Sequence, residues 1–309
     1  MKSKRVLVVL GGTSGERAVS LDSGHACIKA LKRKGYKVSK FDPKKKPLKS
    51  ISKKKVDVIF NSLHGRNGED GVAQSYFEYL GIPYTHSGVI SSYNAMNKIV
   101  SKKIFKQNKI KSPRYFVLKK RKYDQNKLKK FLKKNRMNFP IVIKPANEGS
   151  SIGVKICKDI SEFKNFSNFL FKKYLELMVE NFVGGQEIQV AVLNSVPLGA
   201  IELKPKRRFY DYKAKYSKSA NTEHIMPAKI TNSKYKEVLK IAKKAHQALG
   251  CKGVTRSDFK YFKNQFYLLE TNTQPGMTSL SLVPEIASYR GISFENLVEK
   301  ILLNASVNR

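Results

Sequence analysis

The chain has 309 residues, of which 61 are lysine or arginine and 23 are aspartate or glutamate, so its net charge is +38. Apolar residues make up 41 % and aromatic residues 10 %, which excludes a disordered chain, and the length predicts about two or three compact lobes. No apolar run approaches the ~20 residues that a helix needs to cross a bilayer, so we expect no membrane segment.

The first third of the chain alternates strand-like and helix-like patterns. Residues 6–10 are an apolar run that leads into Gly11, which predicts a first strand rather than a signal peptide. Residues 20–31 have a helical pattern, and residues 36–41 and 56–60 have the pattern of strands. This alternation predicts an α/β lobe with a parallel sheet and crossover helices.

Two further lobes are expected after Asn97. A helix over residues 98–107 precedes a lysine-rich stretch, and a short apolar strand at 141–143 marks the approximate start of the second lobe. The third lobe contains a half-buried strand at 188–193 and a helix whose apolar face runs from residue 235 to 249.

Both later helices carry end signals. Gly250 follows the helical pattern of residues 235–249 and is expected to end that helix. Ser293 is expected to cap the last helix, whose apolar face comprises Phe294, Leu297, Val298, Ile301 and Leu302.

The basic residues occur in separate groups, such as 44–46, 53–55 and 119–122. Such groups are typical of solvated loops and helix faces. No RNA-recognition motif, zinc finger or basic zipper accompanies them, so we expect no dedicated nucleic-acid partner.

The three cysteines, Cys27, Cys157 and Cys251, lie far apart without CxxC spacing. This spacing predicts neither disulfides nor a zinc site and fits a reducing cytoplasm.

A candidate metal site lies near the C-terminal end. Two strand patterns flank a turn at residues 263–264, so Asp258 is expected opposite Leu269 or Glu270, with Glu270 and Asn272 on one face. Two carboxylates and an amide are the hard oxygen donors that Mg²⁺ prefers. Acidic residues on a hairpin can also form a solvated face, but inside apolar strands they are costly unless paired or metal-bound.

A candidate phosphate site lies between residues 141 and 154. A strand there delivers Lys144, and a loop rich in glycine and serine follows it at residues 148–154. Free backbone N–H groups and hydroxyls of such a loop can hold phosphate oxygens. Gly-Ser turns are common, and the P-loop pattern is absent, so the loop alone identifies no fold.

Three motifs in chain order resemble D-alanine–D-alanine ligases of the ATP-grasp superfamily. They are GGTSGERAVSL at residues 11–21, HGRNGEDG at 64–71 and LLETNTQPGMTS at 268–279. The resemblance covers nearly the whole chain. It implies a Rossmann-like substrate domain over residues 1–97, a central ATP-grasp lobe over 98–184 and a C-terminal lobe, with the metal and substrate site, over 185–309.

The resemblance also implies how ATP is held. Lys98, Lys144 and Lys215 would contact the phosphates, and the loop that contains Ser151 would close over them. The adenosine contacts would come from Glu180 to the adenine amino group, from the Val183 backbone and from Glu187 to the ribose hydroxyls. Asn181 and Gln186 differ from the residues often found at their positions in the family.

On the substrate side, the resemblance assigns Glu16 to the ammonium group of the first D-alanine and His64 to substrate binding. Tyr216 would bond to Ser150 and so to Glu16. In the family, tyrosine at that position goes with an amine as second substrate, whereas relatives that make D-alanyl-D-lactate often have phenylalanine. Lys213 departs from a common acidic residue in the same loop.

The implied reaction is the joining of two D-alanines through an acyl phosphate, with two Mg²⁺ or Mn²⁺ ions at Asp258, Glu270 and Asn272. Arg256 and the Gly276 N–H would stabilise the oxyanion. Ser281 and Leu282 would bind the carboxylate of the second D-alanine. Family members are usually homodimers. The alternatives are a ligase with another acceptor, such as D-lactate or D-serine, and a basic, non-enzymatic nucleic-acid binder on an old ligase fold.

Overall fold

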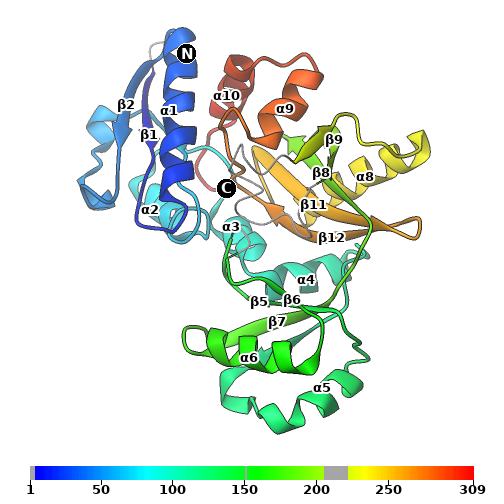
Figure 1. Cartoon of the computed structure of the whole chain (residues 1–309). Helices are drawn as coiled ribbons and strands as arrows, with labels where there is room; N and C mark the ends of the chain where they lie inside the picture. The colour runs from blue at the N-terminus through cyan, green and yellow to red at the C-terminus, as the bar shows by residue number, and fades with distance from the viewer. Residues whose placement is uncertain (1–3, 150–151, 205–221) are drawn as a thin grey trace.

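A computed structural model describes residues 4–149, 152–204 and 222–309 of the chain. Its helices pack around three separate sheets (Figure 1). The helices are α1 (Arg17–Arg33), α2 (Val72–Leu80), α3 (Val89–Met96), α4 (Lys98–Gln107), α5 (Leu128–Lys134), α6 (Ile160–Phe171), α8 (Asn232–Ala248), α9 (Leu282–Tyr289) and α10 (Phe294–Leu303). Within these described ranges, no helix combines the length and apolar character needed to cross a membrane.

The first sheet is parallel and has three strands in the order β2-β1-β3. These strands are β1 (Arg5–Val9), β2 (Lys37–Phe41) and β3 (Val58–Asn61). The predicted parallel sheet with crossover helices is confirmed, because α1 connects β1 to β2. Each strand boundary lies within two residues of the prediction, and α1 extends beyond the predicted 20–31 at both ends.

The second sheet is antiparallel, with the order β4-β7-β5-β6. Its strands are β4 (Tyr115–Lys119), β5 (Ile141–Pro145), β6 (Lys155–Cys157) and β7 (Glu176–Asn181). Helices α5 and α6 pack on it and share its buried core, in the lower part of Figure 1. The strand predicted at 141–143 is the first part of β5.

The third sheet is also antiparallel, with the order β10-β9-β8-β11-β12. Its strands are β8 (Gln186–Leu193), β9 (Val196–Lys204), β10 (Glu223–Ile225), β11 (Val254–Phe262) and β12 (Gln265–Asn272). Helix α8 packs on this sheet with the predicted apolar face and ends before Gly250, whose φ is +73°. A left-handed glycine after the last turn is a common helix end, and the prediction for Gly250 is confirmed.

Local capping explains where two functionally important helices begin. The Asn97 side chain accepts hydrogen bonds from the backbone N–H groups of Ile99 and Val100, at 3.1 and 3.2 Å, so α4 starts at Lys98 as predicted. The predicted cap Ser293 is confirmed, since its hydroxyl accepts from the N–H of Asn296 at 3.3 Å.

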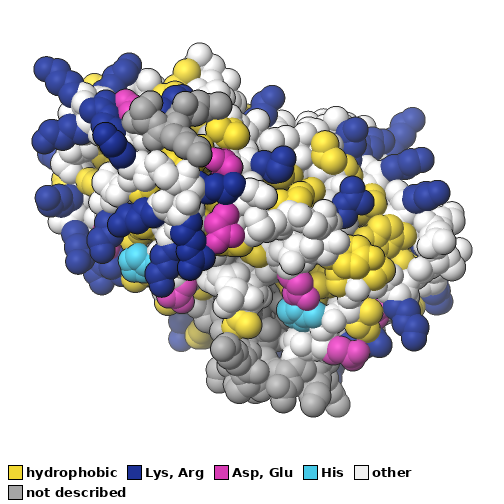
Figure 2. All heavy atoms as spheres, turned by 90° about the horizontal axis from the view of Figure 1, so that it is seen from above, with side chains coloured by type: hydrophobic (Ala, Val, Ile, Leu, Met, Phe, Trp, Pro, Cys, Tyr) yellow, Lys and Arg dark blue, Asp and Glu magenta, His cyan; other side chains and the backbone are white. Residues whose placement is uncertain are grey.

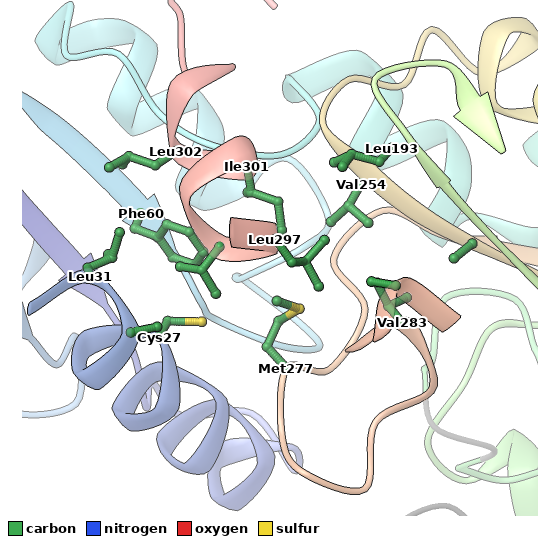
Figure 3. Close-up of a cluster of buried hydrophobic side chains, with 14 of the residues drawn as sticks. Cys27, Leu31, Phe60, Leu193, Val254, Met277, Val283, Leu297, Ile301 and Leu302 are labelled. Carbon is green, nitrogen blue, oxygen red and sulfur yellow. The ribbon is translucent and has the colours of Figure 1, made fainter. Parts of the chain in front are cut away.

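One buried cluster joins the first sheet to the third. Figure 3 shows Cys27 and Leu31 of α1 facing Phe60 of β3 and Ile301 of α10, with Leu193 and Val254 on the far side. Because Leu297, Val298 and Ile301 are fully buried between the two sheets, α10 fills the interface that holds them together.

The lysines and arginines do not form one stripe on the face seen in Figure 2, where they lie on both margins with acidic side chains among them. Some are paired with acids, as Arg17 is with Asp42 at 2.7 Å and Arg5 is with Asp57 at 2.6 Å. This distribution agrees with solvated surface charge.

Candidate active site

The hairpin of β11 and β12 brings the predicted metal ligands together. Asp258 lies directly opposite Glu270 in the antiparallel register, which confirms one of the two expected pairings, and Arg256 lies opposite Asn272. A bulge follows Asp258. Residues opposite each other or two apart share one face of a sheet, so all four side chains point to the same side.

Arg256 holds Asp258 with two hydrogen bonds, from Nε to Oδ1 at 2.8 Å and from Nη2 to Oδ2 at 2.9 Å. The Asn272 amide lies 3.5 Å from Oδ2 of the same carboxylate. Asp258 is only 4 % exposed, so a carboxylate at this position needs such a partner. The pairing fixes the orientation of the first predicted metal ligand.

The donor set fits a divalent ion that is shared with a nucleotide. Across residues 4–149, 152–204 and 222–309, no three His, Cys, Asp or Glu side chains are placed to hold a metal ion. The two carboxylates and one amide of the hairpin are therefore a partial set of hard oxygen donors. Mg²⁺ accepts such a set, because it usually keeps several water ligands and binds phosphate oxygens as well.

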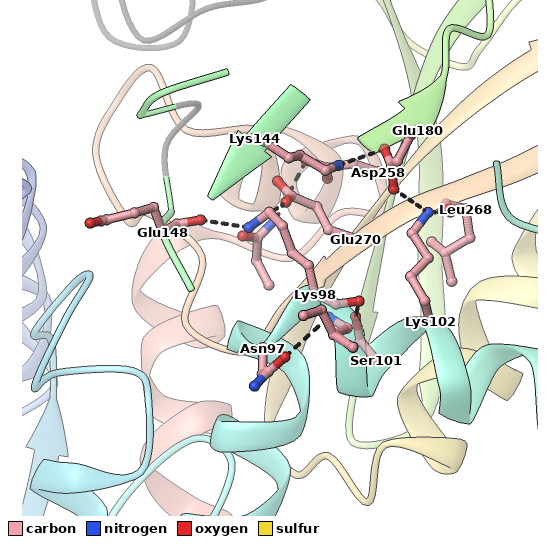
Figure 4. A network of polar contacts seen from close by, with 12 residues as sticks. Asn97, Lys98, Ser101, Lys102, Lys144, Glu148, Glu180, Asp258, Leu268 and Glu270 are labelled. Atoms are coloured by element: carbon pink, nitrogen blue, oxygen red, sulfur yellow. Dashed lines mark hydrogen bonds and ion pairs between the residues drawn. The ribbon is translucent and has the colours of Figure 1, made fainter. Parts of the chain in front are cut away.

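Lys98 reaches the same face from α4. Its Nζ lies 3.5 Å from Oε2 of Glu270 and donates to the carbonyl of Glu148, as Figure 4 shows. A small cavity of about 20 Å³ opens at this point and is lined by Glu69, Ala95, Met96, Lys98, Gly149, Glu270, Thr271, Asn272 and Thr273. The structure thus brings Lys98 and two of the predicted metal ligands to one cavity.

A second group of charges lies next to this cavity. Glu180 of β7 is 2 % exposed and stands between two lysines, with Oε2 2.7 Å from Lys144 Nζ and Oε1 2.9 Å from Lys102 Nζ. Burial alone would raise the pKa of the Glu180 carboxyl, but the charges of both lysines outweigh it and lower that pKa. Burial lowers the pKa of Lys102 to about 8 although Glu180 opposes the shift.

The segment after β7 leads directly into the third sheet. Val183 lies in the link between β7 and β8, and Glu187 on β8 is held by Lys260 Nζ at 2.9 Å. Gly185 has a φ of +84°, and a Cβ there would stand 2.1 Å from the Tyr261 carbonyl oxygen. Only glycine fits this crossing point, so the path of the link between β7 and β8 is sterically defined there.

The start of α1 supplies an acidic corner. Glu16 and Glu69 are both buried, and a Cβ on Gly149 would stand 2.6 Å from Oε1 of Glu16 and 3.4 Å from Oε1 of Glu69. Burial and the neighbouring Glu16 charge raise the pKa of Glu69 well above its usual value. This corner suits a cationic group such as an ammonium, which would relieve the repulsion between the two carboxyls.

His64 lies close to this corner but is buried. Burial lowers the pKa of its imidazole to about 4, so the ring is neutral at pH 7. The Ser14 hydroxyl donates to the His64 carbonyl at 2.6 Å, and Asn61 Nδ2 donates to Gln274 Oε1 at 2.9 Å. These bonds join the loops after β1, β3 and β12 into one unit.

The segment after β12 forms a potential anion site. Leu282 is the first residue of α9, and Ser281 at its N-cap position accepts a hydrogen bond from the Thr278 N–H at 2.9 Å. A Cβ on Gly276 would stand 2.8 Å from Oγ of Ser281, so these residues are neighbours. The first N–H groups of a helix lack intrahelical acceptors and favour anions.

Four of the predicted site residues, Ser150, Ser151, Lys215 and Tyr216, lie outside the described residues. Glu69 and Lys102 are two charged groups of this region that are not among the site residues predicted from the sequence, although a signal for each is present there. Glu69 belongs to the HGRNGEDG motif, and Lys102 lies four residues after Lys98, which places it on the same face of a helix.

Comparison with known proteins gives consistent results. Residues 40–87 match the family model described as the D-ala D-ala ligase N-terminus, and residues 104–303 match the one described as the D-ala D-ala ligase C-terminus. The D-alanine–D-alanine ligase of Pelagibacter ubique (strain HTCC1062) is 52 % identical over 309 residues, which covers 99 % of this chain and 100 % of that protein.

Solved structures agree with the sequence matches. A D-alanine–D-alanine ligase from Bacillus anthracis superposes with a TM-score of 0.86 at 32 % identity, covering 98 % of this chain and 97 % of that one. The VanG D-Ala:D-Ser ligase from Enterococcus faecalis superposes with a TM-score of 0.83 at 28 % identity, covering 97 % and 98 %. The fold is therefore common to ligases with different second substrates.

Proposed function

The chain belongs to the D-alanine–D-alanine ligase family, and we propose on this premise that it uses ATP to join two D-alanines for peptidoglycan precursor synthesis. The observation that carries this proposal is the cavity where Lys98, Glu270 and Asn272 meet Gly149 and Glu69. This cavity supports the proposal because a lysine and two oxygen donors line it beside a buried acidic corner, an arrangement that suits phosphate, a divalent ion and an ammonium group.

The first step needs the carboxylate of one D-alanine to become an acyl phosphate, because a free carboxylate is a poor acyl donor. Glu16 holds the ammonium of this D-alanine beside Gly149, while Lys98 and Lys144 bind the phosphates of ATP. Two Mg²⁺ or Mn²⁺ ions at Asp258, Glu270 and Asn272 would neutralise phosphate charge. We include Ser150, Ser151 and Lys215 in the phosphate site from the family resemblance.

The second step is attack by the amine of the other D-alanine on the acyl phosphate, with loss of phosphate. Arg256 and the Gly276 N–H stabilise the tetrahedral oxyanion, and each well-placed donor contributes on the order of 3 kcal/mol. Ser281 and the Leu282 N–H bind the carboxylate of the attacking molecule. The geometry that supports this assignment is the close approach of Gly276 to Ser281 at the start of α9.

Adenosine is assigned to the link between the second and third sheets. Glu180 accepts from the adenine amino group, the Val183 backbone contacts the base, and Glu187 holds the ribose. His64 takes part in substrate binding as a neutral ring. Tyr216 and Ser150 complete a chain to Glu16.

We further propose three units, 1–97, 98–184 and 185–309, because each sheet lies within one of these ranges. A homodimer and a cytoplasmic location follow from the family resemblance. The three buried, free cysteines are compatible with that location. Light scattering of the purified protein tests the dimer.

The test of the reaction is ADP release by the purified protein with ATP, Mg²⁺ and D-alanine. We expect turnover that depends on D-alanine and yields D-alanyl-D-alanine. A folded protein without such turnover refutes the proposal.

A second candidate function is ligation of D-alanine to D-serine, which is favoured by the superposition on VanG. Parallel reactions with D-serine or D-lactate as the second substrate distinguish the two. We expect D-alanine to give the highest kcat/KM.

A further inference from the structure

Lys102 is a completely buried lysine that none of the proposed steps uses. It lies on α4 one turn after Lys98 and is 0 % exposed. Figure 4 shows its side chain pointing to Glu180 and to the Leu268 carbonyl on β12, at 2.9 and 3.4 Å from Nζ. Burying an ammonium group costs several kcal/mol unless it is paired. The ion pair with Glu180 therefore offsets the cost of burying the Lys102 charge, just as Lys102 offsets the cost of burying the Glu180 charge.

The proposed function implies a change in the charge balance around Glu180 when a nucleotide binds. In the structure one carboxylate faces two ammonium groups, since Lys144 lies 2.7 Å from its second oxygen. When Lys144 turns to the phosphates, as the proposed function requires, Glu180 keeps only Lys102. A lysine with no exposed surface cannot turn to solvent, so Lys102 is the permanent partner.

The charge state of Glu180 decides which base it can bind. An ionised carboxylate only accepts hydrogen bonds, so it binds an amino group and repels a carbonyl oxygen. A protonated carboxyl can also donate, and it would then bind a carbonyl oxygen as well. Burial without a cationic partner raises the pKa of a carboxyl group and so favours its protonated form.

We propose that Lys102 is a positioning residue that sets base specificity, because it keeps Glu180 ionised and selects a 6-amino purine over a 6-oxo purine. This inference rests on the proposed function, in which Glu180 faces the adenine amino group. It predicts that removing the Lys102 charge changes which nucleotide is used and does not simply slow the reaction.

The test compares ATP with inosine triphosphate, which has a carbonyl oxygen in place of the amino group, in the Lys102→Met variant at saturating D-alanine. We expect kcat/KM for ATP to fall about tenfold, mainly through KM, and the ratio of inosine triphosphate to ATP activity to rise about tenfold. A purely structural role of Lys102 would lower both activities alike and leave the ratio unchanged, which overturns the inference.

Two further variants complete the experiment. Lys102→Gln keeps a hydrogen-bonding group beside Glu180 but not the charge, so it guards against misfolding and should show the same rise in the ratio. Retention of the ATP preference in this variant also overturns the inference. Lys106→Met makes the same change at an exposed lysine of α4 and should leave the ratio unaltered. Absence of D-alanine-dependent turnover in the unmodified protein refutes the proposed function instead.

Discussion

Gly149→Ala separates loss of function from loss of stability at the first substrate site. The added methyl carbon would stand 2.6 Å from Glu16 Oε1, about 0.8 Å inside the 3.4 Å at which ordinary contact begins. The atom it meets is the end of a flexible side chain, and Gly149 has no positive φ. Glu16 can therefore move aside with little cost to folding, but its carboxylate then leaves the position proposed for the substrate ammonium.

The expected loss follows from this displacement. Moving a positioning group by about 1 Å reduces catalysis on the order of 100-fold, so a shift of about 0.8 Å predicts a 10- to 100-fold lower kcat/KM for D-alanine. This is equivalent to about 1.4 to 2.7 kcal/mol. The assay is ADP release with D-alanine varied at saturating ATP, together with urea unfolding, in which we expect a change below about 1 kcal/mol.

Gly291→Ala is the matched control because it should show the opposite pattern. Nothing lies within 4 Å of a Cβ at Gly291, but its φ is +72°. The variant should lose about 1 kcal/mol of unfolding free energy through backbone strain and keep its kcat/KM. Unchanged D-alanine kinetics in Gly149→Ala, or a loss that parallels unfolding, would show that Glu16 does not act as argued.

Three other substitutions test separate parts of the structure. Asp258→Asn should lower kcat about 100-fold and raise the Mg²⁺ concentration needed for half-maximal activity; an unchanged Mg²⁺ dependence contradicts the metal role. Burial lowers the pKa of His246 to about 4. The contribution of this neutral side chain to the free energy of unfolding is therefore fully present above pH 6.5 and is lost as the pH falls towards 4. His246→Gln should therefore flatten the pH dependence of unfolding free energy by about 1.4 kcal/mol per pH unit, in urea titrations at pH 7, 6 and 5. Ile301→Ala should cost about 2–5 kcal/mol of unfolding free energy, and a cost below 1 kcal/mol would exclude α10 as a packed connector.

The hairpin of the candidate site could be predicted because its information is local. Alternation along two strands and a turn at residues 263–264 predict that Asp258 lies opposite Leu269 or Glu270. In the structure Asp258 pairs with Glu270, and the register shifts at the bulge that follows Asp258. The starts of α4 and α10 were predictable for the same reason, since Asn97 and Ser293 bond to N–H groups two or three residues ahead.

The partners of Glu180 could not be predicted in this way. Lys102, Lys144 and Glu180 lie on three elements, and their contact depends on how α4 packs against the second sheet. Likewise, the approach of Gly149 to Glu16 depends on the placement of a loop far along the chain. Periodicity states which face of an element is buried, but not which charged side chain it meets there.

The two connections between sheets differ in kind, and this predicts which part moves when ATP binds. The first and third sheets share the apolar cluster around α10, whose buried side chains carry no charge that a phosphate could attract. The second sheet is tied to α4 by the ion pair of Lys102 with Glu180, and in the proposed function Lys144 leaves Glu180 to bind phosphate. We therefore expect a non-hydrolysable ATP analogue to change hydrogen exchange in β5 and β7 much more than in β1 and α10. Equal changes in the hydrogen exchange of all four elements would mean that the apolar cluster around α10 also rearranges. That result would contradict the inference that its burial keeps the first and third sheets together.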